Sequence, residues 1–291
     1  MNPFLIKKES SEIPDYCYLI AEIGINHNGS LEITKDLIAQ SKAAGFDAVK
    51  FQKRTIDIVY SNEILNSYRK SPWGITTRAQ KEGLEFSIDE YIEIDHYCKT
   101  LNIDWFVSCW DIPSQEKMRN FNTPYNKIAS AMATNLDFVN CVASEKKPTF
   151  ASTGMMEIEQ IDRLVDIFKN FKCPLILMHT VSTYPASESD LNLKCIKTLS
   201  ARYGLPVGYS GHETNTAPSI FAAVLGAPVI ERHVTLDRAM YGSDQSASLE
   251  LPGMHSLCST IRKLKDCLGD GQKRILEEEV VVSNKLRYWR G

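Results

Sequence analysis

Short apolar runs recur eight times along the chain, and a longer amphipathic or polar segment follows each run. Within the runs, apolar residues are nearly continuous and do not alternate strictly with polar ones. Such runs are typical of parallel strands that are covered on both faces of a sheet. We therefore expect strands at residues 18–26, 48–53, 105–110, 125–130, 148–153, 175–182, 206–212 and 229–235.

The segments between these strands carry apolar residues at the spacing of one helix face. The first such segment, around Leu37 and Ile38, is expected to end at Gly45. In the last segment the apolar stripe consists of Leu257, Ile261, Leu264 and Leu268, and Gly269 ends it. Most intervals from one strand to the next have the size of one βα unit.

Eight alternations of strand and helix predict an α/β protein that forms a single (β/α)8 TIM barrel, with a doubly wound open sheet as the alternative. We expect one domain over residues 1–291. It has an N-terminal extension at 1–16 that covers the bottom of the barrel, an insertion at 55–86 after the second strand, and a charged, partly helical tail at 271–291. Long loops after barrel strands lie at the catalytic end and often act as lids.

Composition limits the class of protein and its location. Hydrophobic residues make up 43% of the chain and charged residues 24%, which is ordinary for a globular protein with a full core. A net charge of -3 favours neither nucleic acid nor an anionic membrane as partner. The N-terminal residues contain no apolar signal segment, and the eight cysteines include no Cys-x-x-Cys pair. We expect a cytoplasmic protein whose cysteines are mostly small buried apolar residues.

Two of the predicted strands end in a histidine, at His212 and His233. Reactive groups of a barrel lie at the carboxyl ends of its strands, so neighbouring strands would present these two imidazoles side by side. Two imidazoles, with water and substrate oxygens in the other positions, suit an octahedral Mn²⁺ or Mg²⁺ site better than a closed zinc site. The alternative is that each histidine is a hydrogen-bonded core residue.

Lysines interrupt two of the apolar runs, at Lys50 and Lys127. Burial of an ammonium group is costly without an anionic partner. Hydroxyl groups at other strand ends come from Ser130, Ser152 and Ser210. Together these groups predict a cradle for a small polyanion, with phosphate and carboxylate as candidates. The alternative is that the lysines form internal salt bridges with Glu22 or Glu231. Glu22 itself lies in an apolar run, so it could also have a raised pKa and serve in acid–base chemistry.

Seven motifs lie in a fixed order along the chain. They are AEIGINHNG at 21–29, VKFQK at 49–53, YNKIAS at 125–130, STGM at 152–155, GYSGHE at 208–213, ERHVT at 231–235 and GSDQSASLE at 242–250. In this order they resemble the sialic acid synthase family, the N-acetylneuraminate synthases, over residues 18–284. The resemblance implies a (β/α)8 barrel and a transferase.

That transferase would condense phosphoenolpyruvate with an N-acylmannosamine-type or mannose-type aldehyde, with or without a 6-phosphate. The products would be a nonulosonic acid and inorganic phosphate. The resemblance also implies a divalent metal, commonly Mn²⁺ with Mg²⁺ or Co²⁺ as alternatives, and a homodimer.

The resemblance assigns roles to individual positions of this chain. The metal ligands would be His212 and His233. The phosphoenolpyruvate site would consist of Lys50, Lys127, Ser130, Ser152 and Ser210. The acidic residue near the reacting carbons would be Glu22, and the sugar contacts would be Gln52, Tyr184 and Asp244.

The chain departs from the family pattern in three respects. Family members commonly carry a C-terminal antifreeze-like domain that supplies an arginine to the sugar, and we expect this chain to lack it. The turn at 108–111 contains Cys109 where a Ser-Thr-Pro-like sequence is common, and 131–134 contains Met132 where an acidic sugar contact is common. An altered or phosphorylated sugar could instead be received by Arg54, Arg78 or Arg238, for which the alternative is solvated surface.

Two other function classes are compatible with these residues. One is a Schiff-base aldolase with Lys127 or Lys50 as its nucleophile, although it gives the two histidines no role. The other is a non-catalytic barrel that binds phosphoenolpyruvate or a sugar.

Overall fold

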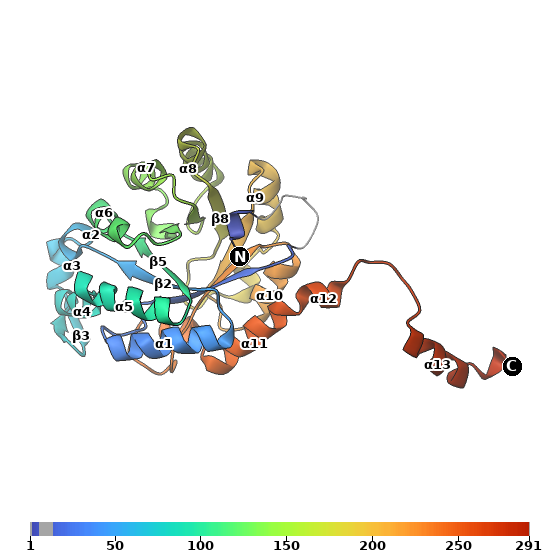
Figure 1. Ribbon diagram of the computed structural model, residues 1–291. Helices are drawn as coiled ribbons and strands as arrows, with labels where there is room; N and C mark the ends of the chain where they lie inside the picture. Colours follow the sequence, from blue (N-terminus) through green and yellow to red (C-terminus); the bar gives the residue numbers. More distant parts are fainter. Residues whose placement is uncertain (1, 6–13, 291) are drawn as a thin grey trace.

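The eight expected strands close into a parallel barrel in a computed structural model that describes residues 2–5 and 14–290 (Figure 1). The strands are β1 Tyr18–Gly24, β2 Ala48–Lys53, β5 Asp104–Cys109, β6 Asn126–Ile128, β7 Thr149–Ser152, β8 Leu175–His179, β9 Val207–Gly211 and β10 Val229–His233. Because β1 pairs with both β2 and β10, the sheet has no edge. The predicted (β/α)8 barrel is confirmed, and the open doubly wound sheet is wrong.

Most predicted strands extend past the observed carboxyl end. The segment expected to be extended at 175–182, for example, stops pairing at the end of β8. The extra residues belong to the loops that follow, because the ladder hydrogen bonds end where the strands diverge at the mouth of the barrel.

Helices cover the outside of the barrel. They are α1 Leu31–Ala44, α5 Ile88–Thr100, α6 Ile112–Met118, α7 Leu136–Ser144, α8 Ile158–Phe171, α9 Cys195–Tyr203, α10 Ala217–Val224 and α11 Leu251–Arg262. Helix α1 ends at Gly45, which adopts a left-handed conformation with φ of 106° and confirms the predicted stop. The last stripe was expected to be continuous, but it breaks into α11 and a short α12, Leu264–Leu268. Leu264 still packs against the core cluster, but Leu268 is exposed, so the stripe loses its partner surface beyond Leu264.

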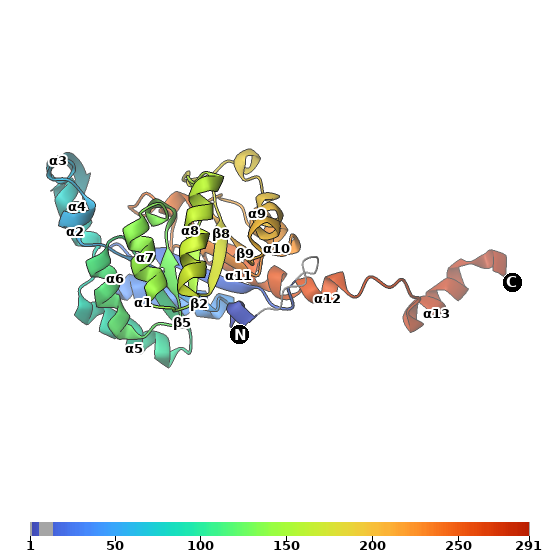
Figure 2. The same ribbon diagram turned by 90° about the horizontal axis from the view of Figure 1, so that it is seen from above.

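The insertion after β2 forms a small substructure at the carboxyl end of the strands. It contains α2 Ile56–Val59, α3 Asn62–Asn66, the hairpin β3 Tyr68–Ser71 and β4 Gly74–Thr76, and α4 Thr77–Leu84. Figure 2 shows these helices standing out from the barrel. The insertion therefore lies beside the mouth where the predicted site residues are found.

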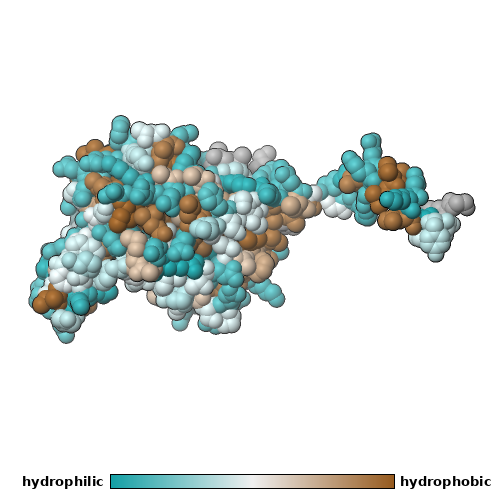
Figure 3. Space-filling model, turned by 90° about the horizontal axis from the view of Figure 1, so that it is seen from below, coloured by the Kyte–Doolittle hydropathy of each residue, from teal (hydrophilic) through white to brown (hydrophobic). Residues whose placement is uncertain are grey.

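The C-terminal segment stands away from the barrel (Figure 1). Its helix α13, Glu277–Leu286, leaves apolar residues such as Val281 and Leu286 exposed. Figure 3 shows this hydrophobic surface on the protruding arm.

Among the described residues, none of the helices is both long and apolar enough to cross a membrane. All eight cysteines lie within residues 14–290, and none forms a disulfide.

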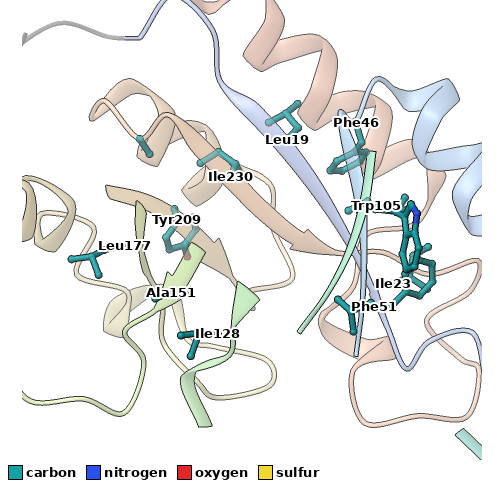
Figure 4. Packing of buried hydrophobic residues seen from close by; sticks show 14 of the residues in the cluster. Leu19, Ile23, Phe46, Phe51, Trp105, Ile128, Ala151, Leu177, Tyr209 and Ile230 are labelled. Atoms are coloured by element: carbon teal, nitrogen blue, oxygen red, sulfur yellow. The ribbon is translucent and has the colours of Figure 1, made fainter. Parts of the chain in front are cut away.

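Strand alternation divides the core into two apolar clusters. Residues such as Leu19, Ile23 and Ile230 belong to the larger cluster, which includes residues of the surrounding helices (Figure 4). The smaller cluster fills the barrel interior with Tyr18, Ile20, Ala48, Phe106, Tyr125, Phe150, Ile176, Met178 and Val229. This inner cluster closes the amino end of the barrel, and the buried charged side chains of β1, β2, β6 and β10 lie above it.

Phe4 packs on that inner cluster from below. Its ring centroid lies 5.7 Å from that of Tyr125 and 5.1 Å from that of Phe150. Of the expected extension at 1–16, residues 1 and 6–13 lie outside the described part of the chain.

A hydrogen-bonded carboxylate joins the first and last parts of the barrel. Asp47 accepts from the backbone N–H of Leu19 at 2.7 Å, from the Arg262 guanidinium at 2.7 Å and from the hydroxyl of Tyr16. Arg262 also donates to the carbonyl oxygen of Cys17 at 2.6 Å. One acidic side chain before β2 thus connects the start of β1 with the end of α11.

We predict that Asp47→Ala lowers the free energy of unfolding by about 2–3 kcal/mol, because it removes a charged acceptor from a backbone N–H and a guanidinium. Chemical denaturation measures this change. Asp15→Ala is the matched control, since its pair with Lys265 is largely exposed and should contribute nothing measurable. Equal stability of Asp47→Ala and the parent protein would contradict this role of Asp47.

Candidate active site

Four charged side chains lie directly above the inner apolar cluster. They are Glu22, Lys50, Lys127 and Glu231, and each is at most 4% exposed. Each lies two positions after a residue of the inner cluster, so the period of two turns it toward the barrel axis. Strand geometry therefore brings all four groups together inside the barrel.

Glu231 lies between the two lysines. The Lys127 ammonium donates to both Glu231 carboxylate oxygens, at 2.9 and 2.8 Å, and Lys50 Nζ lies 3.6 Å from Oε1. Lys50 Nζ also lies 2.7 Å from Glu22 Oε2, and Ser210 donates to Glu231 at 3.1 Å. The two lysines thus make the internal salt bridges that were one alternative from the sequence, and these bridges hold the ammonium groups in place.

The two carboxylates have opposite acid–base character. Burial raises the pKa of Glu22 to about 7, and the neighbouring Lys50 only partly offsets this effect. Burial also acts to raise the pKa of Glu231, but Lys127 and Lys50 outweigh it and bring the value down to about 2. Glu22 can therefore gain and release a proton near neutral pH, whereas Glu231 stays ionised.

The predicted histidines lie next to each other at the mouth, with ring centroids 5.6 Å apart. His212 Nδ1 lies 2.7 Å from the carbonyl oxygen of Val181, which fixes the tautomer and leaves Nε2 facing the Tyr184 hydroxyl at 3.0 Å. His233 Nδ1 is buried and has no hydrogen-bond partner among the described residues; Asp244 Oδ2 is 4.0 Å away. Burial lowers the pKa of both histidines, that of His212 to about 4.

These histidines fit a divalent cation. Both are neutral at physiological pH, which is the form that binds metals, and one buried ring nitrogen lacks a partner. Within residues 2–5 and 14–290, no cluster of three or more His, Cys, Asp or Glu side chains has a metal-binding arrangement. His212 and His233 could each supply one nitrogen ligand, and water or substrate would complete the coordination.

Gly24 marks the point where three predicted residues converge. Its φ of +56° lies in the left-handed region, and a Cβ there would lie 3.1 Å from both Gln52 Nε2 and Glu22 Oε1 and 3.4 Å from His233 Cε1. Gln52 Nε2 also donates to Glu22 Oε1 at 2.8 Å. The carboxylate, the amide and the imidazole therefore face one shared space.

Serine hydroxyl groups surround Gly154 on the opposite side of the mouth. A Cβ at Gly154 would lie 2.8 Å from Ser130 Oγ and 2.3 Å from Ser182 Oγ. The Ser182 hydroxyl is buried and unpaired among the described residues, whereas Ser152 is buried on β7. Ser182 was not among the predicted site residues; its position after β8, two residues before Tyr184, was the available signal.

The local departures from the family pattern lie outside the mouth. Cys109 and Met132 both belong to the cluster between the barrel and its helices. Burial raises the pKa of the Cys109 thiol well above its usual range, so the group is a neutral packing residue. These two substitutions therefore leave the polar interior unchanged.

The three candidate arginines lie in different surroundings. Arg78 pairs with Asp57 at 2.7 Å and Glu82 at 3.2 Å. Arg238 donates to the carbonyl oxygens of Ser248 and Thr214, at 2.7 and 3.1 Å. Only Arg54 reaches a predicted site residue, because its guanidinium donates to Gln52 Oε1.

A closed (β/α)8 barrel with a buried charge network and two neutral histidines at its mouth defines an enzyme-type barrel. The chain belongs to the NeuB family, whose model matches residues 37–273. The resemblance that the seven motifs indicated is thereby confirmed.

Individual relatives cover most of the chain. It is 34% identical over 273 residues to the N-acetylneuraminate-9-phosphate synthase of Homo sapiens, spanning 93% of this chain and 76% of that protein. It is 33% identical over 279 residues to the N,N'-diacetyllegionaminic acid synthase of Legionella pneumophila, spanning 93% and 78%. A crystal structure of N-acetylneuraminic acid synthetase from Leptospira borgpetersenii in complex with citrate superimposes with a TM-score of 0.81, at 28% identity and 97% coverage of both chains.

We predict that Lys127→Met lowers the free energy of unfolding by about 3–5 kcal/mol, because it leaves the buried Glu231 carboxylate short of its main partner. The double variant Lys127→Met/Glu231→Leu should recover most of this loss, since Lys50 keeps Glu22 at 2.7 Å. Urea denaturation of both variants measures the difference.

Lys35→Met is the control, because it removes a lysine whose pair with Glu93 is exposed. If the double variant were no more stable than the single one, an uncompensated charge would not explain the loss.

Proposed function

We propose that this protein condenses phosphoenolpyruvate with the open-chain aldehyde of an N-acylmannosamine-type or mannose-type sugar. The products are a nonulosonic acid and inorganic phosphate. One observation carries the proposal: a buried lysine–carboxylate network and two neutral histidines meet at the same mouth of one barrel. The first part suits a small polyanion and the second suits a metal that binds an aldehyde.

The lysine network supports binding of phosphoenolpyruvate. Lys50 and Lys127 place two ammonium groups inside the barrel, and Glu22 and Glu231 hold them in position. Ammonium groups attract an anion strongly in a site that excludes water. The hydroxyl groups of Ser130, Ser152, Ser182 and Ser210 supply further donors from neighbouring strand ends.

The histidines support binding of a divalent cation by His212 and His233, with Mn²⁺ as the first choice and Mg²⁺ or Co²⁺ as alternatives. When bound, such a cation acts as a Lewis acid that polarises the aldehyde carbonyl. Gln52, Tyr184 and Asp244 lie around the same space and would orient the sugar hydroxyl groups.

The reaction follows from this arrangement. Carbon C3 of phosphoenolpyruvate attacks the aldehyde carbon, whose oxygen becomes an alkoxide, and water adds to the electron-poor carbon C2. An ionised Glu22 accepts a proton of that water, which its pKa of about 7 permits near neutral pH, and passes it to the alkoxide. The tetrahedral adduct then cleaves its C2–O bond and releases phosphate, while Lys50 and Lys127 stabilise the charge that collects on the leaving group.

We predict that the purified protein with Mn²⁺, phosphoenolpyruvate and a panel of mannosamine-type sugars releases inorganic phosphate. His212→Ala and His233→Ala should each lower bound Mn²⁺ and the rate of phosphate release by at least about 100-fold, because one of two protein ligands is lost. Metal analysis and a phosphate-release assay measure both effects.

His96→Ala is the matched control, since His96 is exposed on α5. Circular dichroism checks that all variants remain folded. The proposal fails if no sugar of the panel supports phosphate release by the folded, Mn²⁺-loaded parent protein.

The Schiff-base alternative makes a different prediction. Burial lowers the pKa of Lys127, but its nitrogen donates to both oxygens of the Glu231 carboxylate, and this pairing makes it a poor nucleophile. Borohydride treatment in the presence of pyruvate should therefore leave the mass of the protein unchanged. A trapped adduct on Lys127 or Lys50, detected by mass spectrometry, would favour the aldolase, and tight phosphoenolpyruvate binding without turnover of any aldehyde would favour a non-catalytic barrel.

A further inference from the structure

A second buried ion pair lies on the outer face of the two strand ends that carry His212 and His233. Arg232, just before His233, lies two positions after Ile230 of the larger apolar cluster, so it faces the helices. Its Nη1 lies 2.9 Å from Oε1 of Glu213, the residue after His212, and the two side chains are 0% and 1% exposed. The pair is therefore on the opposite face of these strands from the lysine network.

Two hydroxyl groups also bind the Glu213 carboxylate. Tyr209 of β9 donates to Oε2 at 2.8 Å, and Ser219 of α10 donates to Oε1 at 3.2 Å. Ser219 also accepts from Arg232 Nη1 at 2.9 Å, so this hydroxyl bridges both charges. The carboxylate is thus held from β9, β10 and α10 at once.

Arg232 also holds the backbone that follows β9. Its guanidinium donates to the carbonyl oxygen of Glu213 and, at 2.8 Å, to that of Asn215. The carbonyl oxygen between them, on Thr214, accepts from Arg238 at 3.1 Å. Side chains of β10 and of the loop after it therefore bind three successive carbonyl groups directly beyond the end of β9.

The last residue of β9 is a glycine that leaves room for this carboxylate. Gly211 is the partner of Arg232 in the register of β9 and β10. A Cβ at Gly211 would lie 2.6 Å from Glu213 Oε2 and 2.7 Å from Oε1, which is too close for a side chain. The Glu213 carboxylate therefore lies directly against the backbone that precedes His212.

We propose that Arg232 and Glu213 are positioning residues that set the separation of the His212 and His233 imidazoles, whose ring centroids are 5.6 Å apart. Each is the chain neighbour of one histidine, and their ion pair joins the two strand ends from behind. A buried ion pair adds little net stability but requires a specific partner, which suits it to fixing the register of two elements. The inference rests on the proposed function, in which the two imidazoles bind a divalent cation.

Titration with Mn²⁺, followed by electron paramagnetic resonance of the free ion, tests this role without any substrate. Glu213→Gln keeps the shape of the side chain and removes its charge, so it should weaken Mn²⁺ binding by about 10-fold. Ser219→Ala removes only the neutral bridge and should weaken Mn²⁺ binding by about 3-fold. At saturating Mn²⁺, the KM for phosphoenolpyruvate should stay within about two-fold of the parent value, because the lysine network lies on the other face of the strands.

Asp47→Ala is the matched control for a loss of stability, because Asp47 binds Leu19 and Arg262 at the amino ends of the strands. It should leave Mn²⁺ affinity unchanged although it destabilises the fold. Thermal unfolding of the metal-free proteins checks that the three variants are folded. If Glu213→Gln does not fold, Ser219→Ala carries the test, since it leaves both charges in place.

The outcomes separate this inference from the proposed function. If the folded variants lose stability but bind Mn²⁺ as tightly as the parent protein, the pair belongs only to the core and the positioning role is wrong. An equal loss of Mn²⁺ affinity in Asp47→Ala would also overturn it, since affinity would then follow stability in general. Weaker Mn²⁺ binding in the two variants, together with no phosphate release by the parent protein, would contradict the condensation and leave the positioning role intact. A parent protein that binds no Mn²⁺ would contradict both.

Discussion

The ion pair network around Glu231 is the interaction on which the site depends. Glu231 projects from β10, Lys127 from β6 and Lys50 from β2, so one carboxylate joins strands that are far apart in the sequence. Burial of two ammonium groups in a barrel interior is unfavourable unless carboxylates accompany them. The barrel interior therefore keeps its charged layer only when β10 and β6 face each other across the axis, which closure of the barrel provides.

The layer beneath this network gives the two carboxylates different properties. Aromatic and aliphatic side chains fill the amino half of the barrel and keep water away from Glu22 and Glu231. Glu231 contacts both lysines and stays ionised, whereas burial dominates at Glu22 and raises its pKa to about 7. Two residues of the same type thus differ in acid–base character through position alone.

The sequence by itself determined the eight strands, their order and the residue types at their ends. Continuous apolar runs encode buried parallel strands, and the seven motifs identified the family before any contact was known. The register of the strands and the closure of the barrel decided which side chains meet inside it. Whether Lys50 and Lys127 would meet carboxylates or solvent depended on distances between side chains of different strands, which periodicity does not encode.

The same physical reason explains what the sequence missed. Ser182 resembles many other polar residues along the chain, and only the fold places it beside Gly154. Arg78 and Arg238 looked equivalent to Arg54, but nearby carboxylates and carbonyl oxygens engage them elsewhere. Local patterns determine elements and residue chemistry, whereas the pairing of charges is set by tertiary distances.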